Sequence, residues 1–504
     1  GGVLTATAPA APSGVRPQTR YGYTLLAGNA YALTSTSNCQ TGSSCTGTAD
    51  EVKTSIAYGA ASANYLPTST TSGSGDGALS ATQNFTFDTI GNLATVDGPL
   101  AGTGDTTRYR YDEKRRVIGV VGPDPDGAGV RKHIAQRSTY DADWQVTQVE
   151  VGNVNSQSDP DWAAMTVAQK AVTTYDANAR PIKIEAQSSG TTYTVSQTSY
   201  DALGRIDCSA LRMNSATFGS LPSSACTAAT AGSHGPDRIT KHVYDAASQQ
   251  TKLQTAYGTA QQADEVTARY TANGKSAHVI DAENNRTAYT YDGHDRLVKT
   301  EYSSTTKGAN AVNTADYEQL TYDANSNVTS RRLRDGTSIG YGYDNLNRVT
   351  SADLPNTMFE VHDKGFGYDL LGRLTFATMT NGWNNSFAYD ALGRQVQENA
   401  PLGNIARSFD ASGRMTSETL PGGGLTVNYD YDVTGNVIAV RENGATSGVG
   451  VLASYSYDGL GRRLGVTYGN GVSRAYGYDP LSRLSSLSGS FPVATANNFS
   501  NSFA

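Results

Sequence analysis

The sequence has little of what membrane proteins and metalloenzymes need. It contains no run of about 18 apolar residues, the length that spans a bilayer. No phosphate-binding loop, dinucleotide fingerprint or nucleophile elbow stands in a context that would support it. The 6 histidines show neither an HExxH pattern nor a cysteine–histidine spacing typical of zinc sites: His133, His234, His242, His278, His294 and His362. The sequence therefore predicts no metal, no cofactor, no catalytic residue and no enzyme activity.

The chain also has no large excess of charge of one sign. The 39 Lys and Arg and the 46 Asp and Glu residues leave a net charge of −7, with the two signs interspersed. Nothing in this distribution steers the protein to nucleic acid or to an anionic membrane. Asp124-Pro125-Asp126-Gly127 resembles the start of a calcium loop, but the twelfth position, where a bidentate Glu would stand, is Ala135. A tight turn is the better interpretation.

Only 4 cysteines are present, in two local pairs. Cys39 and Cys45 flank a Gly/Ser loop, and Cys208 and Cys226 flank a segment rich in Ser and Ala. Two disulfides, and with them an oxidising compartment, are the preferred interpretation. A zinc site built from all four lacks CxxC spacing, and free buried cysteines are the remaining alternative.

Apolar residues make up 38%, a low share for a globular protein, whereas tyrosine is plentiful at 30. Many Tyr and Thr residues favour strands, and the modest apolar content suits a sheet with much solvent-exposed surface. A thick buried core would need more apolar residues.

One short phrase recurs along the chain: an aromatic residue, Asp, two variable residues, a turn residue, then Arg or Asn. Its clearest copies are Tyr200-Asp201-Ala202-Leu203-Gly204-Arg205, Tyr368-Asp369-Leu370-Leu371-Gly372-Arg373, Tyr389-Asp390-Ala391-Leu392-Gly393-Arg394 and Tyr457-Asp458-Gly459-Leu460-Gly461-Arg462. Looser copies begin at Phe87, Tyr111, Tyr140, Tyr175, Tyr244, Tyr270, Tyr291, Tyr322, Tyr343, Phe409, Tyr431 and Tyr478. Near-regular self-similarity of this kind marks a repeat architecture.

Each copy predicts a β-hairpin. The residues up to Tyr389 alternate between two faces, and Asp390 opens a type I turn by accepting N–H bonds from the residues two and three ahead. Gly393 takes the left-handed conformation that closes the turn with a G1 bulge, and Arg394 begins the returning strand.

Other residues fill the glycine position in some copies. Asn347 suits a positive φ, whereas Ser248, Ser326, Ser482, Ala179 and Asp295 fit less well. Trp144 and Arg115 fit worst, and we expect altered turns there.

Second turns must join one hairpin to the next, and the candidates are Pro421-Gly422-Gly423-Gly424, Asn381-Gly382, Asp335-Gly336 and Gly469-Asn470-Gly471. About sixteen copies then give roughly 32 antiparallel strands, and at ~4.8 Å per strand the sheet is ~150 Å wide. Closed into one turn it would be ~50 Å across, too wide for side chains to fill. The predicted fold class is all-β: antiparallel hairpins in one large curved or spiralling sheet that forms a hollow barrel or shell. Each Tyr is expected to stack on its counterpart one repeat away, with an Arg guanidinium over the ring.

These phrases resemble the YD (tyrosine-aspartate) repeats of the RHS family, most closely at Tyr368 to Leu374. The resemblance covers about residues 80–484, and Arg20-Tyr21-Gly22-Tyr23 is similar to Gly340-Tyr341-Gly342-Tyr343. The family includes bacterial RHS proteins, insecticidal toxin complexes and teneurins, and it implies a sheet that spirals into a hollow cocoon. In the bacterial members the shell encloses a C-terminal toxic polypeptide, and a core segment with cleaving aspartates follows the repeats. No run of Asp-Pro-x-Gly motifs is found near the C-terminus here.

We expect three parts in the chain. Residues 1–79 would be degenerate repeats with the Cys39–Cys45 loop, residues 80–484 the YD-repeat array, and residues 485–504 the start of a further repeat. Inserts interrupt the array at about residues 152–172 and 207–236. In the first insert, Asp159 as the cap and Pro160 at the first position predict a short helix that continues to about Lys170. Asn501-Ser502-Phe503-Ala504 matches the residues that precede Tyr389, so an internal fragment of a longer protein is expected.

The leading hypothesis is a non-enzymatic structural shell segment of a secreted or cell-surface bacterial protein. Its partners would be an enclosed polypeptide, such as a C-terminal toxin or effector, and neighbouring repeats of the full-length protein. The repeated Asp residues are interpreted as turn caps, because catalysis needs one preorganised carboxylate pair rather than a ladder. The alternative is a cell-surface adhesion or carbohydrate-binding module, in which Trp144, Trp162 and Trp383 would stack on sugars. Packing within the wall is the better interpretation of these three residues.

Overall fold

In the computed structural model, residues 2–503 are described except for 27–30, 61, 63, 128, 356–362, 381 and 493–497. His362, Asn381 and Ala504 therefore lie outside the described residues. Within this part of the chain, no helix is long and apolar enough to cross a membrane. Among the described residues, the regular structure is 38 strands in one sheet, one α-helix and two short 3₁₀ turns. The prediction of an all-β fold is confirmed, with more strands than the roughly 32 expected.

The first third of the chain contains β1 (Thr5–Thr7), β2 (Gln18–Leu25), β3 (Tyr31–Cys39), β4 (Glu51–Tyr58), β5 (Pro67–Ser74), β6 (Ser80–Phe87), β7 (Leu93–Asp97), β8 (Thr107–Tyr111), β9 (Val117–Val121), β10 (His133–Tyr140), β11 (Val146–Val154), α1 (Asp159–Ala163) and β12 (Thr166–Tyr175). The middle contains β13 (Pro181–Ser188), β14 (Thr191–Tyr200), β15 (Ile206–Arg212), η2 (Ser215–Thr217), β16 (Arg238–Tyr244), β17 (Gln250–Thr255), β18 (Ala263–Tyr270), β19 (Ser276–Asp281), β20 (Arg286–Tyr291), β21 (Leu297–Ser303), β22 (Val312–Tyr322), β23 (Val328–Arg332), β24 (Ser338–Tyr343) and β25 (Val349–Asp353). The last third contains β26 (Lys364–Tyr368), β27 (Leu374–Met379), β28 (Asn384–Tyr389), β29 (Gln395–Ala400), β30 (Gly403–Phe409), β31 (Met415–Thr419), β32 (Thr426–Tyr431), β33 (Val437–Glu442), η3 (Gly448–Gly450), β34 (Ala453–Tyr457), β35 (Arg463–Tyr468), β36 (Ser473–Tyr478), β37 (Leu484–Ser490) and β38 (Phe499–Ser502).

The sheet is a continuous antiparallel meander, because each strand pairs with the strands before and after it in the chain. From β4 onward, every even-numbered strand up to β36 ends on Tyr or Phe, so the repeat phrases all lie on one edge of the sheet. We call this edge the YD edge and the opposite one the far edge. The predicted second turns at Gly336, Pro421 to Gly424 and Gly471 join strands at the far edge, as does Gly382.

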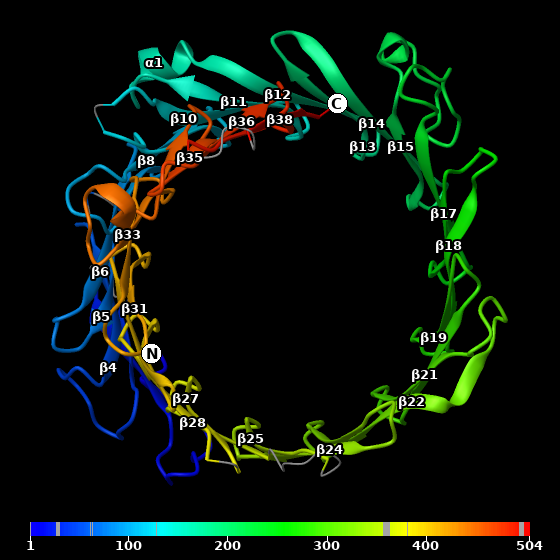
Figure 1. The fold of residues 1–504 in the computed structure, drawn as a ribbon. Coiled ribbons are helices and arrows are strands. Elements are labelled where there is room, and N and C mark those ends of the chain that lie inside the picture. The colour runs from blue at the N-terminus through cyan, green and yellow to red at the C-terminus, as the bar shows by residue number, and fades with distance from the viewer. Residues whose placement is uncertain are drawn as a thin grey trace.

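The sheet curves into a ring around an open centre and then overlaps itself (Figure 1). Strands β26–β38 lie beside the blue and cyan N-terminal strands, whereas β14–β22 form a single stretch of wall. We call residues 2–188 the N-terminal coil and residues 364–503 the C-terminal coil. The structure is thus a spiral wall, one of the forms that the sequence predicts.

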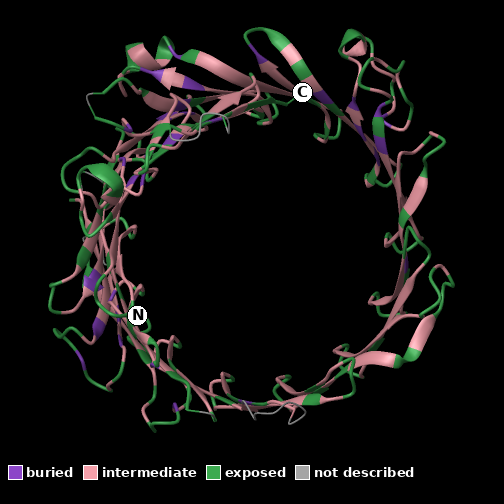
Figure 2. Cartoon of the chain, viewed as in Figure 1, coloured by how far each residue is buried: buried purple, intermediate pink, exposed green. Residues whose placement is uncertain are grey.

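Little of this wall is fully buried; most side chains are half-buried (Figure 2). Two small buried clusters lie where inserts cover the sheet. One contains Val121, Ala135, Val154 and Met165, and the other contains Cys208, Ala210, Ala225 and Ile239. A modest apolar content therefore suffices, because each residue packs against a strand neighbour rather than into a central core.

The helical insert is shorter than predicted. Helix α1 ends at Ala163, and its N-cap is Ser158, which accepts a hydrogen bond from the Asp161 N–H; it is not Asp159. Residues from Thr166 onward pair with β11 and β13 as strand β12. Strand pairing on both sides overrides the helix signal, which is a weak prior against tertiary contacts.

A buried ion pair organises the second insert, and no pattern in the sequence predicts it. Arg212 Nη1 lies 2.6 Å from Asp237 Oδ2, with side chains 0% and 2% exposed. Arg212 also donates to the carbonyl oxygens of Ser224 and Thr227, and Asp237 accepts N–H bonds from Met213 and Ala229. The bonds of Arg212 tie the loop between β15 and β16 to the end of β15, and those of Asp237 hold the loop together.

Candidate functional site: the repeat turn and the seam between coils

The repeat turn is a bulged hairpin held by its aspartate. At Asp390, the backbone N–H bonds to the Arg394 oxygen at 3.0 Å and the carbonyl accepts the Gly393 N–H at 3.0 Å. The Asp390 Oδ1 atom accepts the N–H groups of Leu392 and Arg394, two and four residues ahead. The prediction that Oδ1 also accepts the N–H of the residue three ahead is wrong, because the Gly393 N–H donates to the Asp390 backbone oxygen instead. Gly393 has φ of 80°, and the register shifts between Ala388 and Tyr389, which confirms the bulge.

The same geometry persists where the glycine is missing. Asn347, Ser248, Ser326, Ser482, Ala179 and Asp295 all have positive φ. Arg115 and Trp144, with φ of 64° and 70°, also keep it, so the prediction of altered turns there is wrong. In both turns the aspartate still accepts the N–H bonds two and four residues ahead. The carboxylate and the paired strands hold the backbone there despite the unfavourable residue.

The repeat arginine connects each turn to the next one. Arg394 Nε lies 2.6 Å from Asp390 Oδ2, and its Nη1 donates to the backbone oxygen of Asp410 at 2.6 Å. Its guanidinium lies over the ring of Phe409, 4.9 Å from the centroid. The same guanidinium-over-ring contact joins Arg116 to Tyr140, Arg180 to Tyr200, Arg205 to Tyr244, Arg296 to Tyr322, Arg348 to Tyr368, Arg373 to Tyr389, Arg414 to Tyr431 and Arg462 to Tyr478.

The repeat tyrosine makes a second link between repeats through its hydroxyl. Tyr368 OH donates to the Val349 oxygen at 2.8 Å, just past the arginine of the preceding repeat. Equivalent bonds are made by Tyr140, Tyr175, Tyr200, Tyr244, Tyr270, Tyr291, Tyr322, Tyr343, Tyr431, Tyr457 and Tyr478. The predicted arginine–ring contact is confirmed. The predicted tyrosine–tyrosine stacking is not found among the described residues, since strands of successive repeats are separated by a returning strand.

Electrostatics favour the ionised turn aspartates. Hydrogen bonds from the backbone N–H of Arg296 and then from its side chain outweigh the cost of desolvation and lower the pKa of Asp292 to about 2. The pKa of Asp112 is likewise lowered, first by the backbone N–H of Arg116. At Asp201 and Asp344, burial raises the pKa, but bonds from Arg205 and Arg348 outweigh it and leave the pKa below the usual value. These carboxylates are therefore turn caps and ion-pair partners rather than proton carriers.

The seam is where the YD edge of the C-terminal coil rests on the far edge of the N-terminal coil. Leu370 N–H donates to Gln40 O at 2.8 Å, and Arg373 Nη2 to Gln40 Oε1 at 2.7 Å. Further seam contacts join Val433 to Pro125, Arg131 to Asp432, Asn153 to Gly459, and Gln169 to Pro480 and Ser482. The residues joined in this way are 301 to 333 positions apart in the sequence, so one circuit of the wall takes about that length of chain.

Sequence reasoning found the repeat residues but missed the seam residues. The residues Tyr200, Asp201, Gly204 and Arg205 and their counterparts in the other three clear copies all lie in YD turns. Gln40, Asn153 and Gln169 belong to no repeat phrase. At Gly459, the second residue of its turn, an added Cβ would lie 3.0 Å from Asn153 Oδ1, so the absence of a side chain leaves room for this seam contact.

Both predicted disulfides are present, Cys39–Cys45 and Cys208–Cys226. Each has a carboxylate nearby, Asp50 and Asp207 respectively, but the paired sulfurs are not free to bind a metal. Among the described residues, no other cluster has the composition of a metal site. The zinc alternative is thus excluded for this disulfide-bonded structure.

The tryptophans differ in environment. Trp162 lies on Gly119, where a Cβ would come within 2.8 Å of the indole, and under the Arg110 guanidinium. This contact confirms packing within the wall. Trp144 and Trp383 are 59% and 47% exposed. Trp144 still lies against the guanidinium of Arg116.

Known proteins resemble this chain in sequence and in fold. The profile of the family described as Teneurin YD-shell matches residues 163–449, more than half of the 504 residues. The Tc holotoxin pore of Photorhabdus luminescens is similar in structure, with a TM-score of 0.51 and 13% identity over 97% of this chain and 25% of that chain. The crystal structure of TcdB2–TccC3 is similar at a TM-score of 0.36 and 13% identity, over 98% of this chain and 38% of that chain. The chain thus spans well under half the length of these solved chains, and the first likeness shows the fold alone. No curated protein matches the sequence.

Proposed function

Because this chain belongs to the Teneurin YD-shell family, with the repeats of the RHS type, we propose that its wall is a shell segment that encloses a polypeptide. The observation that carries the proposal is the single-layer sheet that closes on itself by a seam around an open centre (Figure 1). Such a wall has two accessible faces and separates an inside from an outside. The enclosed chain would be a toxin or effector carried in the same protein, and the repeat turns would have a structural and non-catalytic role.

Three further assignments belong to this proposal. The parts 1–79, 80–484 and 485–504 would be successive stretches of one wall, since strands of all three pair in the same sheet. The two disulfides support a secreted or cell-surface location, because such bonds persist in oxidising compartments. The four cysteines and the repeat residues would act in stability rather than in catalysis.

The test is to image the protein with and without a cargo. A disordered reporter polypeptide fused after Ala504 is compared, by electron microscopy and limited proteolysis, with the same reporter fused before Gly1 and with the free reporter. Density in the open centre, together with slower digestion of the C-terminal reporter alone, is the expected result. Density outside the wall, or digestion of all three reporters at one rate, would reject enclosure.

A cell-surface carbohydrate-binding role is the second candidate, and the exposed Trp144 and Trp383 favour it. Aromatic faces of this kind stack on sugar rings. Glycan binding that is lost in Trp144→Ala or Trp383→Ala would support this role, and unchanged binding in both variants would remove it.

A further inference from the structure

One repeat inside the seam lacks its arginine. In the repeat that begins at Tyr431, the arginine position is Asn436, which donates to Asp432 Oδ2 at 3.0 Å from its side chain and to Oδ1 at 2.9 Å from its backbone. Asparagine thus replaces the contact of the arginine with its own aspartate. No contact from Asn436 to the next repeat ring, Tyr457, is found in the described structure, since its side chain is too short to reach across.

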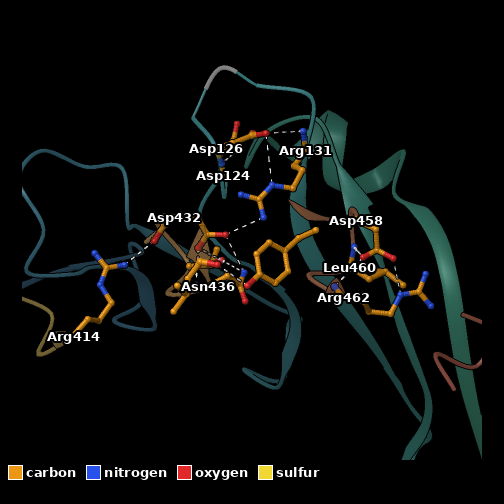
Figure 3. A network of polar contacts seen from close by, with 12 residues as sticks. Asp124, Asp126, Arg131, Arg414, Asp432, Asn436, Asp458, Leu460 and Arg462 are labelled. Atoms are coloured by element: carbon orange, nitrogen blue, oxygen red, sulfur yellow. Dashed lines mark hydrogen bonds and ion pairs between the residues drawn. The ribbon is translucent and has the colours of Figure 1, made fainter. Parts of the chain in front are cut away.

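Arg131 of the N-terminal coil reaches both this aspartate (Figure 3) and the Tyr457 ring. Its Nη1 lies 2.9 Å from Asp432 Oδ2, and its guanidinium carbon lies 5.8 Å from the centroid of the Tyr457 ring. These are two of the three contacts that a repeat arginine makes: with the aspartate of its repeat and with the ring of the next, the third being with the backbone oxygen of the next aspartate. Here a residue 301 positions away supplies the first two.

The distribution of arginine–ring contacts along the chain shows that the position of Arg131 over Tyr457 is specific. Each of the nine repeats that has its own arginine and is followed by another repeat covers the next aromatic ring. Repeats with Asn, Gln or Lys at that position precede Tyr111, Tyr175, Tyr270, Tyr291, Tyr343 and Tyr457. Of these six rings, Tyr457 is the one with a guanidinium over it in the described part of the chain.

Hydrogen bonds within the loop that carries Arg131 hold it in position. The Arg131 N–H donates to Asp126 Oδ2 at 3.1 Å, and Asp126 in turn donates its N–H to Asp124 Oδ1 at 3.3 Å. The side chains of Arg131 and Asp432 are 11% and 2% exposed, so water and salt screen the pair weakly. Beside it, the Val433 N–H donates to the Pro125 oxygen at 3.2 Å, which makes the contact a two-point attachment between coils.

We infer that Arg131 is the missing arginine of the Asp432 repeat, supplied from the preceding coil, and that this exchange fixes the register in which the two coils meet. Asp432, whose own repeat arginine is absent, accepts an arginine from the adjoining wall, whereas a repeat that keeps its arginine already pairs its aspartate with it. Asn436 is thus a specificity determinant of the seam, and Arg131 is its positioning residue.

The test uses three variants of the whole chain: Arg131→Gln, Asn436→Arg and the double variant. Asn436→Arg restores an arginine within the repeat, which competes with Arg131 for Asp432 and for the Tyr457 ring. Hydrogen exchange is followed by mass spectrometry in peptides that cover residues 124–135 and 430–437. Each single variant should exchange at least about tenfold faster on both sides of the seam, because a charged hydrogen bond between coils is lost.

The double variant distinguishes this exchange from a general loss of stability. With the restored arginine in place, Arg131→Gln should add less than about twofold to the exchange rate, since the two changes remove one shared interaction. Arg394→Gln is the matched control, because its contacts at Asp390, Phe409 and Asp410 lie within one coil. It should leave the seam peptides unchanged.

Two outcomes would overturn the inference. An Asn436→Arg chain with unchanged exchange at residues 124–135 would show that Arg131 is not a substitute for the repeat arginine. Fully additive effects in the double variant would show the same. If Arg131→Gln does not fold, Arg131→Lys retains the charge without the planar stacking and should give a smaller increase on both sides; an increase on one side only would also reject the inference.

Discussion

At the scale of the residue, the carboxylate of the repeat aspartate accepts the hydrogen bonds that hold the turn. In most YD turns the Oδ1 atom accepts two backbone N–H groups, and where arginine or asparagine stands four residues on, its side chain pairs with the Oδ2 atom. A carboxylate that accepts several N–H bonds is stabilised in its charged form. This capping explains why the left-handed position tolerates residues as different as Arg115, Ala179 and Trp144.

Gly393→Val tests the strain at this position. Gly393 has φ of 80°, and an added Cβ would meet nothing within 4 Å, so any cost comes from the backbone conformation rather than from a clash. We expect a loss of ~1–3 kcal/mol in the free energy of unfolding, measured by urea titration. Gly393→Asn should cost clearly less, because Asn347 occupies the equivalent place in another repeat. Equal stability of the Val variant and the native chain would contradict the strain argument.

The pH dependence follows from the lowered pKa of the turn aspartates. The pKa of Asp292 is about 2 in the folded chain against an ordinary 3.8, and the pKa values of Asp112, Asp176 and Asp201 are lowered as well. A lowered pKa contributes stability that is fully present above about 4 and is lost as the pH falls toward about 2. The urea midpoint should therefore drop steeply between pH 4 and pH 2. Asp292→Asn should reduce this slope, and a slope identical to that of the native chain would contradict the assignment.

At the scale of the element, the repeat is a hairpin joined to the next hairpin by three contacts outside the strand ladder. These are the arginine over the ring, the arginine on the aspartate carbonyl and the tyrosine hydroxyl on a carbonyl. Where asparagine replaces arginine, as at Asn327, the first contact is lost while the turn itself remains. The residue four positions after the repeat aspartate thus affects the turn and the contact with the next repeat separately.

Asn327→Arg should stabilise the wall. Asp323 would pair with the new side chain, whose guanidinium would cover the Tyr343 ring and donate to Asn347, as Arg296 does to Ser326 in the preceding repeat. We expect a gain of about 0.5–1 kcal/mol in the free energy of unfolding. Ala324→Arg, at an exposed position of the same turn, is the matched control and should change little. A destabilised Asn327→Arg chain would show that the asparagine is required for another reason.

The hairpin was predictable from sequence, because its determinants are local. The Tyr-Asp phrase, the turn residue and the far-edge glycines such as Gly336 specify strand ends within a few residues of themselves. The two cysteine pairs are local in the same sense. The end of helix α1 was not predictable, since pairing of β12 with β11 and β13 decides it.

At the scale of the whole molecule, the seam depends on curvature that no single repeat encodes. Which residues face each other across it follows from the number of residues in one circuit, and inserts such as 155–165 and 213–237 change that number. Gln40 and Asn153 therefore carry no signal in the sequence that pairs them with Arg373 and Gly459. The spiral was predictable as a class of shape, but its register was not.

The seam should also make the wall cooperative, and removing its polar contacts should uncouple the two coils. In an array that touches only its neighbours, one end can open without the other. Here Gln40, Asn153 and Gln169 bond to residues 306 to 333 positions away, so opening of either coil costs contacts in both.

The triple alanine variant should lose about 0.5–1.5 kcal/mol per seam residue in the free energy of unfolding. Hydrogen exchange should then rise in β26–β37 as well as in β3–β12, while β16–β22 stay unchanged. Alanine at Asn178, Asn273 and Asn325, whose hydrogen bonds stay within a turn or reach the neighbouring repeat, is the control. Faster exchange confined to the mutated N-terminal coil would show that the coils merely touch, and that the spiral behaves as a linear chain of hairpins.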